Sequence, residues 1–173
     1  MKNIALSSAI FAAACGPGAS EAPRLASRID ACTLIDARAV SDALDLEMFR
    51  LPQSAPRGGG DGEAYVSSCA FMTVRGEAET MTAFRSAGQA TLTVWSWREP
   101  EGAQSVLENY AARPGRAAEP VAGLGDEAFW NGATVLRIGR LAIVATVDAG
   151  LNPAADRAAE RAIAEAALNV LRE

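Results

Sequence analysis

The sequence of 173 residues contains no histidine, and its single lysine is Lys2. A serine or cysteine nucleophile of a catalytic triad needs an imidazole base, and Schiff-base chemistry needs an amine. The usual zinc sites need imidazole or several thiolates. The chain after Lys2 has no imidazole and no lysine amine and only three cysteines, so we expect no catalytic residue, no metal site and no cofactor. Catalysis by a pair of carboxylates of the glycosidase kind remains open, because a sequence does not show the separation of two acids.

Long apolar runs and positive charge are also scarce. The first apolar run, residues 4–14, is too short for a hydrocarbon core that needs about 20 apolar residues, and no later run is longer. The formal net charge is −5. An acidic chain lacks the basic footprint of a nucleic-acid-binding protein, so we expect no nucleic-acid partner, and anionic lipid would repel it mildly.

The first residues have the order of an export signal. Lys2 precedes the apolar run, and three alanines precede Cys15. This arrangement resembles the signal of bacterial lipoproteins, in which the cysteine after the cut carries the lipid. The resemblance implies that Cys15 is the lipid attachment site, although the family usually has leucine where this chain has Ala12. The alternative is an ordinary secreted protein cut near Ala14.

The predicted organisation has three parts: a signal peptide at 1–14, a lipid anchor and flexible tether at 15–29, and a single α+β domain at 30–173. The tether is rich in glycine, proline and serine and has few large apolar groups. Gly16 stands where aspartate would favour the inner membrane in the sorting system that the signal resembles. We therefore expect an exported protein anchored to the outer membrane and facing the periplasm, or to the cell surface where no outer membrane exists.

The three cysteines are an odd number for an exported chain. If Cys15 carries lipid, Cys32 and Cys69 remain and can form a disulfide in an oxidising envelope. Free thiols at these two positions are the alternative.

Three helices are expected. The first begins after Asp36 as a possible N-cap, although Thr33 could cap one turn earlier. The second begins at Pro100 and stops at Pro114. The third is capped by Asn152 and has Pro153 at its first helical position, and its apolar stripe packs against a sheet. The stripe comprises Ile163, Ala164, Ala167, Leu168, Val170 and Leu171.

Extended segments are expected at residues 46–51, 65–75, 89–98, 134–138 and 141–148, and a short strand is expected to begin near Phe129. Gly139 and Arg140 form the tight turn of a hairpin between the last two strands. Runs of consecutive strands separated by helices favour an α+β fold with an antiparallel sheet layered with about three helices.

The two tryptophans of the 89–98 strand are the candidate contact surface. Alternation places Leu92, Val94 and Ser96 on one face and Trp95 and Trp97 on the other. Two tryptophans on one face can form a binding platform. The interpretation that we favour is that a helix or the 76–88 connection packs over them.

The stretch VAGLGDEAF, residues 121–129, contains only a fragment of a dinucleotide-binding fingerprint. Asp126 and Glu127 would place two negative charges where a pyrophosphate should bind. We therefore interpret it as a structural corner, in which glycines allow positive φ and Asp126 bonds to the backbone of a turn.

Three short motifs resemble a family of bacterial envelope lipoproteins that is classed as a domain of unknown function. They are Cys32-Thr-Leu before a first helix, Cys69-Ala-Phe in a strand, and the V-x-G-L-G-D-E-A stretch from Val121 to Ala128. The resemblance implies an α+β sandwich akin to the PsbP-like fold and a disulfide between Cys32 and Cys69. It implies no activity.

Three functions are therefore considered. The first is a lipid-anchored, non-enzymatic module that binds an envelope protein or a small ligand. The second is a carboxylate enzyme acting on envelope glycans, which needs two acids facing one cleft about 5 to 10 Å apart. The third is a structural assembly factor of an envelope complex, for which a large exposed apolar patch would be the sign.

Overall fold

The computed structural model describes residues 28–52, 64–73, 88–150 and 152–173. The predicted signal peptide, Cys15 and nearly all of the tether lie outside these residues. The described segments form a seven-stranded sheet of order β1-β2-β3-β7-β6-β5-β4. Every neighbouring pair of strands is antiparallel. The prediction of an α+β fold with an antiparallel sheet is confirmed.

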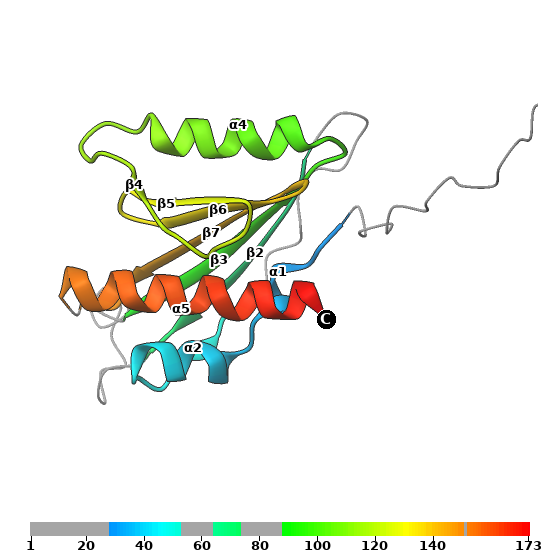
Figure 1. Cartoon of the computed structure of the whole chain (residues 1–173). Coiled ribbons are helices and arrows are strands. Elements are labelled where there is room, and N and C mark those ends of the chain that lie inside the picture. Colours follow the sequence, from blue (N-terminus) through cyan, green and yellow to red (C-terminus); the bar gives the residue numbers. More distant parts are fainter. Residues whose placement is uncertain (1–27, 53–63, 74–87, 151) are drawn as a thin grey trace, which may run out of the picture.

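The helices and strands alternate in groups along the chain (Figure 1). The described helices are α1 (Ala31–Leu34), α2 (Ala37–Leu44), α4 (Pro100–Ala111) and α5 (Pro153–Arg172). The strands are β1 (Phe49–Arg50), β2 (Tyr65–Met72), β3 (Gln89–Ser96), β4 (Glu119–Pro120), β5 (Glu127–Trp130), β6 (Thr134–Ile138) and β7 (Leu141–Asp148).

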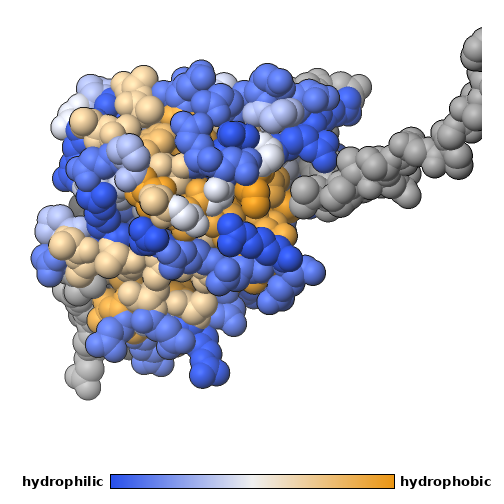
Figure 2. Space-filling view, in the orientation of Figure 1, coloured by the Kyte–Doolittle hydropathy of each residue, from blue (hydrophilic) through white to orange (hydrophobic). Residues whose placement is uncertain are grey.

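The sheet lies between two layers of helices, with α4 on one face and α1, α2 and α5 on the other (Figure 1). The larger apolar core lies on the α5 face, where Ile163 and Leu168 pack with Leu92 and Ile143. A smaller core lies beneath α4. Figure 2 shows hydrophilic residues on the outer sides of the helices and an apolar band between α4 and α5. Burial of these apolar faces holds the layers together.

The faces of β3 follow the predicted alternation. Leu92, Val94 and Ser96 are buried on the α5 side, at 3% exposure or less. Thr91 and Trp95 are half-buried and point toward the opposite face. This strand lies in the middle of the sheet, paired with β2 on one side and with β7 on the other. Both edges of β3 are therefore paired, while its α5 face is buried and its opposite face is half-buried.

Side-chain caps fix the beginnings of two predicted helices. Asp36 accepts a hydrogen bond from the Ala39 backbone N at 2.8 Å at the start of α2. Asn152 accepts from the backbone N atoms of Ala154 and Ala155 at the start of α5, and Pro153 occupies the first helical position. These caps satisfy backbone donors that have no partner within the helix. Both predicted caps are confirmed.

The structure differs from the predicted elements in three places. A short helix, α1, precedes α2 and is capped by Asp30 rather than Thr33. A two-residue edge strand, β4, pairs with the end of β5, and β5 ends at Trp130. Val170 is 45% exposed and does not belong to the buried stripe of α5. The fully buried residues of this helix end at Leu168, and in its last turn Leu171 is partly buried against the core.

Candidate functional site

The predicted disulfide is present and joins Cys32 to Cys69. Cys32 belongs to α1 and Cys69 to β2, so the bridge fastens the beginning of the domain to the sheet. Cys69 is fully buried. Two of the three cysteines are therefore used in the fold. Cys15 lies outside the described residues, and its lipid attachment stays a prediction.

Trp95 and Trp97, the candidate contact residues, lie against α4. The ring of Trp95 meets the ring of Tyr110 edge-on, with 6.2 Å between the centroids. The ring of Trp97 packs so closely on Gly102 that a Cβ at this glycine would overlap it. Both tryptophans are half-buried. The structure thus has the helix packing that the sequence analysis favoured, and a contact role for these two rings stays a prediction.

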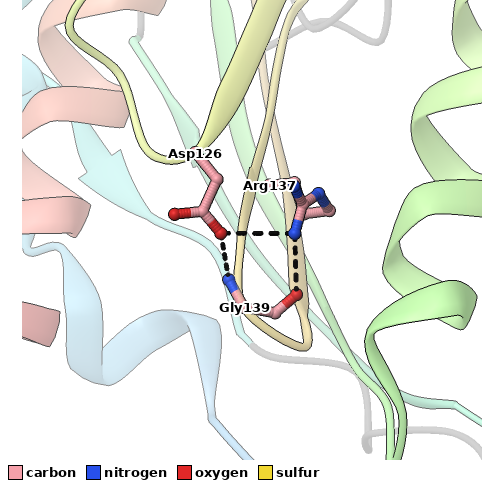
Figure 3. Close-up of polar contacts among 3 residues, drawn as sticks. All are labelled: Asp126, Arg137 and Gly139. Atoms are coloured by element: carbon pink, nitrogen blue, oxygen red, sulfur yellow. Dashed lines mark hydrogen bonds and ion pairs between the residues drawn. The ribbon is translucent and has the colours of Figure 1, made fainter.

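The glycine-rich corner before β5 is tied to the hairpin of β6 and β7 (Figure 3). The Asp126 carboxylate accepts hydrogen bonds from the Gly139 backbone N at 2.7 Å and from the Arg137 side chain at 3.2 Å. Gly125 has φ +59°, and a Cβ there would collide with the Arg137 carbonyl. A close backbone approach thus requires glycine at this position. These contacts agree with the interpretation of the stretch as a structural corner.

A polar cluster that the sequence analysis missed lies between the β5 end of the sheet and α5. Trp130 is on the α5 face, in register with Thr134 and, through it, with the buried Ala145. Its indole Nε1 donates to Oε2 of Glu160 at 2.8 Å. The Val147 backbone N donates to the other carboxylate oxygen at 3.2 Å. Glu160 is only 2% exposed, so it holds the indole from inside the protein.

Burial raises the pKa of Glu160 above its ordinary value of 4.5. The negative charge of Asp156 adds to this rise in pKa, whereas the hydrogen bonds from Val147, Trp130 and Thr134 oppose it. Loss of hydration therefore outweighs the hydrogen bonds at this carboxyl group. Asp156 precedes Glu160 by one helical turn, and its Oδ1 is shielded without a hydrogen-bond partner among the described residues.

Two guanidinium groups lie over the Trp130 ring. The Cζ of Arg157 is 4.5 Å from the ring centroid and that of Arg116 is 5.0 Å from it. The negative face of an indole attracts such cations. Arg157 also pairs with Glu119 at 2.6 Å. Arg116 is exposed, and no carboxylate of the described segments lies within ion-pair distance of it.

Two surface hollows meet at Arg157. One, of about 220 Å³, is lined by Arg116, Trp130, Asp156, Arg157 and Glu160 together with small residues. The other, of about 310 Å³, lies between α5 and residues 120–122 and is lined by Arg157 and Arg161. We call the first the Trp130 hollow. It combines an aromatic ring, two carboxyl groups and two guanidinium groups, which can hold a small polar ligand.

One signal in the sequence could have indicated this cluster. Glu160 precedes Ile163 and Ala164 by three and four residues, which places it on the apolar stripe of α5. A carboxylate on an apolar stripe needs a buried hydrogen-bonding partner. The identity of that partner could not be found in the same way, because Trp130 is 30 residues away in the chain.

The described residues contain no group of three or more His, Cys, Asp or Glu side chains that could hold a metal ion. None of the described helices combines the length and the apolar character needed to cross a membrane.

Comparison with known proteins finds no matching family, no matching curated protein and no matching solved structure. The fold and the cluster define the chain as a disulfide-bonded α+β domain with an antiparallel sheet between two helical layers.

Proposed function

We propose that this chain is an exported, lipid-anchored domain of the cell envelope that acts as a non-enzymatic binding module. The observation that carries the proposal is the Cys32–Cys69 disulfide. Disulfides persist in oxidising compartments such as the periplasm and the cell surface. Because the bridge uses two of three cysteines, Cys15 is left as the one that follows the apolar run and three alanines. Acylation at Cys15 accounts for this odd cysteine.

The tether and the charge support the same arrangement. The glycine-, proline- and serine-rich sequence before Arg28 is typical of a tether, and a coil of this length would span about 20 Å, enough to hold a folded body clear of the headgroups. The chain is acidic, so attraction to anionic lipid cannot hold it at a membrane. More than one acyl chain gives firm anchoring, since each buried methylene contributes about 0.8 kcal/mol.

The binding role is favoured over a carboxylate enzyme by the state of Glu160. Asp156 and Glu160 share the Trp130 hollow, as a pair of catalytic acids would. However, both oxygens of Glu160 already accept hydrogen bonds, and the side chain is 2% exposed. A general acid must reach the atom that it protonates. Glu160 therefore serves better to position Trp130 than to attack a glycan.

An assembly factor is the third candidate. Large apolar patches mark surfaces of this kind. Among the described residues, the large apolar side chains that are exposed are Phe49 and Val170, at 49% and 45%. They lie on β1 and on the last turn of α5, and no extended patch is built from them. A small ligand is therefore the occupant that the site favours.

Replacing Cys15 by serine tests the anchor. We expect the wild-type protein to remain in the membrane pellet through a high-salt wash, whereas Cys15→Ser enters the soluble fraction. The Cys32→Ser/Cys69→Ser double variant loses the disulfide but keeps Cys15, so it should stay in the pellet. Intact-mass measurement should show added acyl mass only where Cys15 is present. A Cys15→Ser protein that still pellets with the membrane would contradict the proposal.

A further inference from the structure

The Trp130 hollow already holds a cation on its aromatic wall, and this cation belongs to the chain itself. Arg116 lies over the indole ring at 5.0 Å from the centroid. It comes from the exposed segment between α4 and β4 and has no carboxylate partner in the described part of the chain. Arg157, by contrast, is tied to Glu119. Arg116 is therefore the group that a competing cation can displace.

The lining of the hollow also includes an acceptor without a donor. Oδ1 of Asp156 is shielded from solvent and has no hydrogen-bond partner among the described residues. Buried polar atoms of this kind usually have a partner, so an unpaired acceptor beside an aromatic ring needs an explanation. Glu160 cannot take this role, because both of its oxygens are engaged.

We propose that the Trp130 hollow binds an organic cation with N–H donors, such as an alkylammonium group, which replaces Arg116 over the indole and donates to Asp156. The chain's own guanidinium shows where the cation lies, and Asp156 supplies the missing charge-assisted hydrogen bond. The hollow of about 220 Å³ has room for an alkylammonium chain. This inference deepens the proposed binding function, and it does not depend on the lipid anchor.

The position of Trp130 indicates that the aromatic wall is fixed before a ligand arrives. Its indole N–H is held by the buried Glu160 at 2.8 Å. A ring with a fixed orientation loses little conformational entropy on binding, which favours a small ligand.

The test uses the full-length protein in detergent micelles, labelled with ¹⁵N and titrated with n-butylamine at pH 7. The indole N–H signals of the three tryptophans report binding, and Trp130→Phe identifies the Trp130 signal. We expect saturable shifts of this signal with a Kd on the order of 1–10 mM, as befits a ligand of few atoms. Tetramethylammonium, which has no N–H donor, should bind about tenfold more weakly.

Two variants distinguish the inference from a merely structural role of the cluster. Asp156→Asn should weaken n-butylamine binding about tenfold, because the charge-assisted hydrogen bond is lost. Arg116→Ala should tighten binding about threefold to tenfold, because the internal competitor is removed. Arg113→Ala is the matched control, since Arg113 lies over the Tyr110 ring, outside the hollow. It should leave the Kd unchanged, and circular dichroism should show each variant folded.

Several outcomes would overturn the inference. One is the absence of a saturable Trp130 shift in the wild type and in Arg116→Ala. Another is weaker amine binding in Arg116→Ala together with saturable binding of acetate or phosphate to the wild type, which would make the hollow an anion site. A lysine peptide acetylated only at its α-amino group distinguishes a side chain of a protein partner from a free amine. Tighter binding of this peptide than of n-butylamine would support the inference and identify the ligand as a protein side chain. Failure of these titrations leaves the fractionation of Cys15→Ser unaffected, so the two proposals fail separately.

Discussion

At the scale of single residues, Glu160 links helix α5 to the sheet through buried hydrogen bonds. Its carboxyl group is buried, and it accepts hydrogen bonds from a side chain on β5 and from the backbone of β7. Removal of one partner from such a group leaves an unsatisfied polar atom, which costs about 1–3 kcal/mol. Glu160 therefore fastens α5 to two strands as well as orienting Trp130.

Glu160→Gln should lower the free energy of unfolding by about 1–3 kcal/mol, because one of the two N–H donors would face the amide NH₂ of glutamine. Urea unfolding measured by circular dichroism checks this value. Glu165→Gln, on the exposed side of the same helix, is the matched control. It should cost less than about 1 kcal/mol, since surface ion pairs contribute little. Equal losses in both variants would show that Glu160 has no special role.

The pH dependence of stability follows from the raised pKa of Glu160. Between the ordinary value of 4.5 and the raised pKa, the folded state binds more protons than the unfolded state. The contribution of Glu160 to the free energy of unfolding must therefore fall as pH rises through this window, and it is fully present below 4.5. The stability difference between wild type and Glu160→Gln should shrink as pH increases. A difference that grows with pH would contradict the burial argument.

At the scale of elements, the contact between α4 and the end of β3 depends on one glycine. A helical glycine replaced by alanine normally gains about 0.5–1 kcal/mol. In α4, however, a Cβ on Gly102 would overlap the Trp97 ring. Gly102→Ala should therefore destabilise the protein by about 1–3 kcal/mol, as overpacking does. Urea unfolding measures the change.

A double-mutant cycle decides whether the Trp97 ring causes this loss. In a Trp97→Ala background the overlap is removed, so Gly102→Ala should regain its usual stabilising sign. If Gly102→Ala stabilises the protein in both backgrounds, helix α4 does not pack on Trp97 as described.

Local patterns predicted the elements whose signals are contained within a few residues. Asn152 with Pro153 indicated the start of α5, and Gly139 with Arg140 indicated the hairpin turn. Strand β4 was missed because two residues have no periodicity, and Pro120 argues against a strand except at an edge. The Trp130 hollow was missed because four separate segments of the chain form it. Its hydrogen bonds and ring contacts are set by the docking of α5 on the sheet, which no local pattern contains.

At the scale of the whole molecule, the disulfide connects the beginning of the domain to β2, while α5 closes the same layer from the other end of the chain. The segment around α1 has other attachments as well. The Ala31 backbone N donates to the Ser67 hydroxyl at 3.0 Å, and the Ile29 backbone N donates to the Ser96 hydroxyl at 3.3 Å. The bridge is therefore not the sole link between this segment and the sheet.

Because those hydrogen bonds and the α5 core remain after reduction, the Cys32→Ser/Cys69→Ser variant should fold but be less stable. The bridge spans a sequence separation of 37 residues. In the chain-entropy model such a loop contributes up to about 4 kcal/mol, mainly by restricting the unfolded state. Each kcal/mol shifts the melting temperature by about 2–4 °C, so we expect it to fall by about 10 °C. Thermal unfolding of the wild type with reductant should give the same lowered temperature. A reduced wild type that melts like the oxidised protein would show that the bridge adds no stability. An unfolded double variant would show that the core cannot hold the layers together without the disulfide.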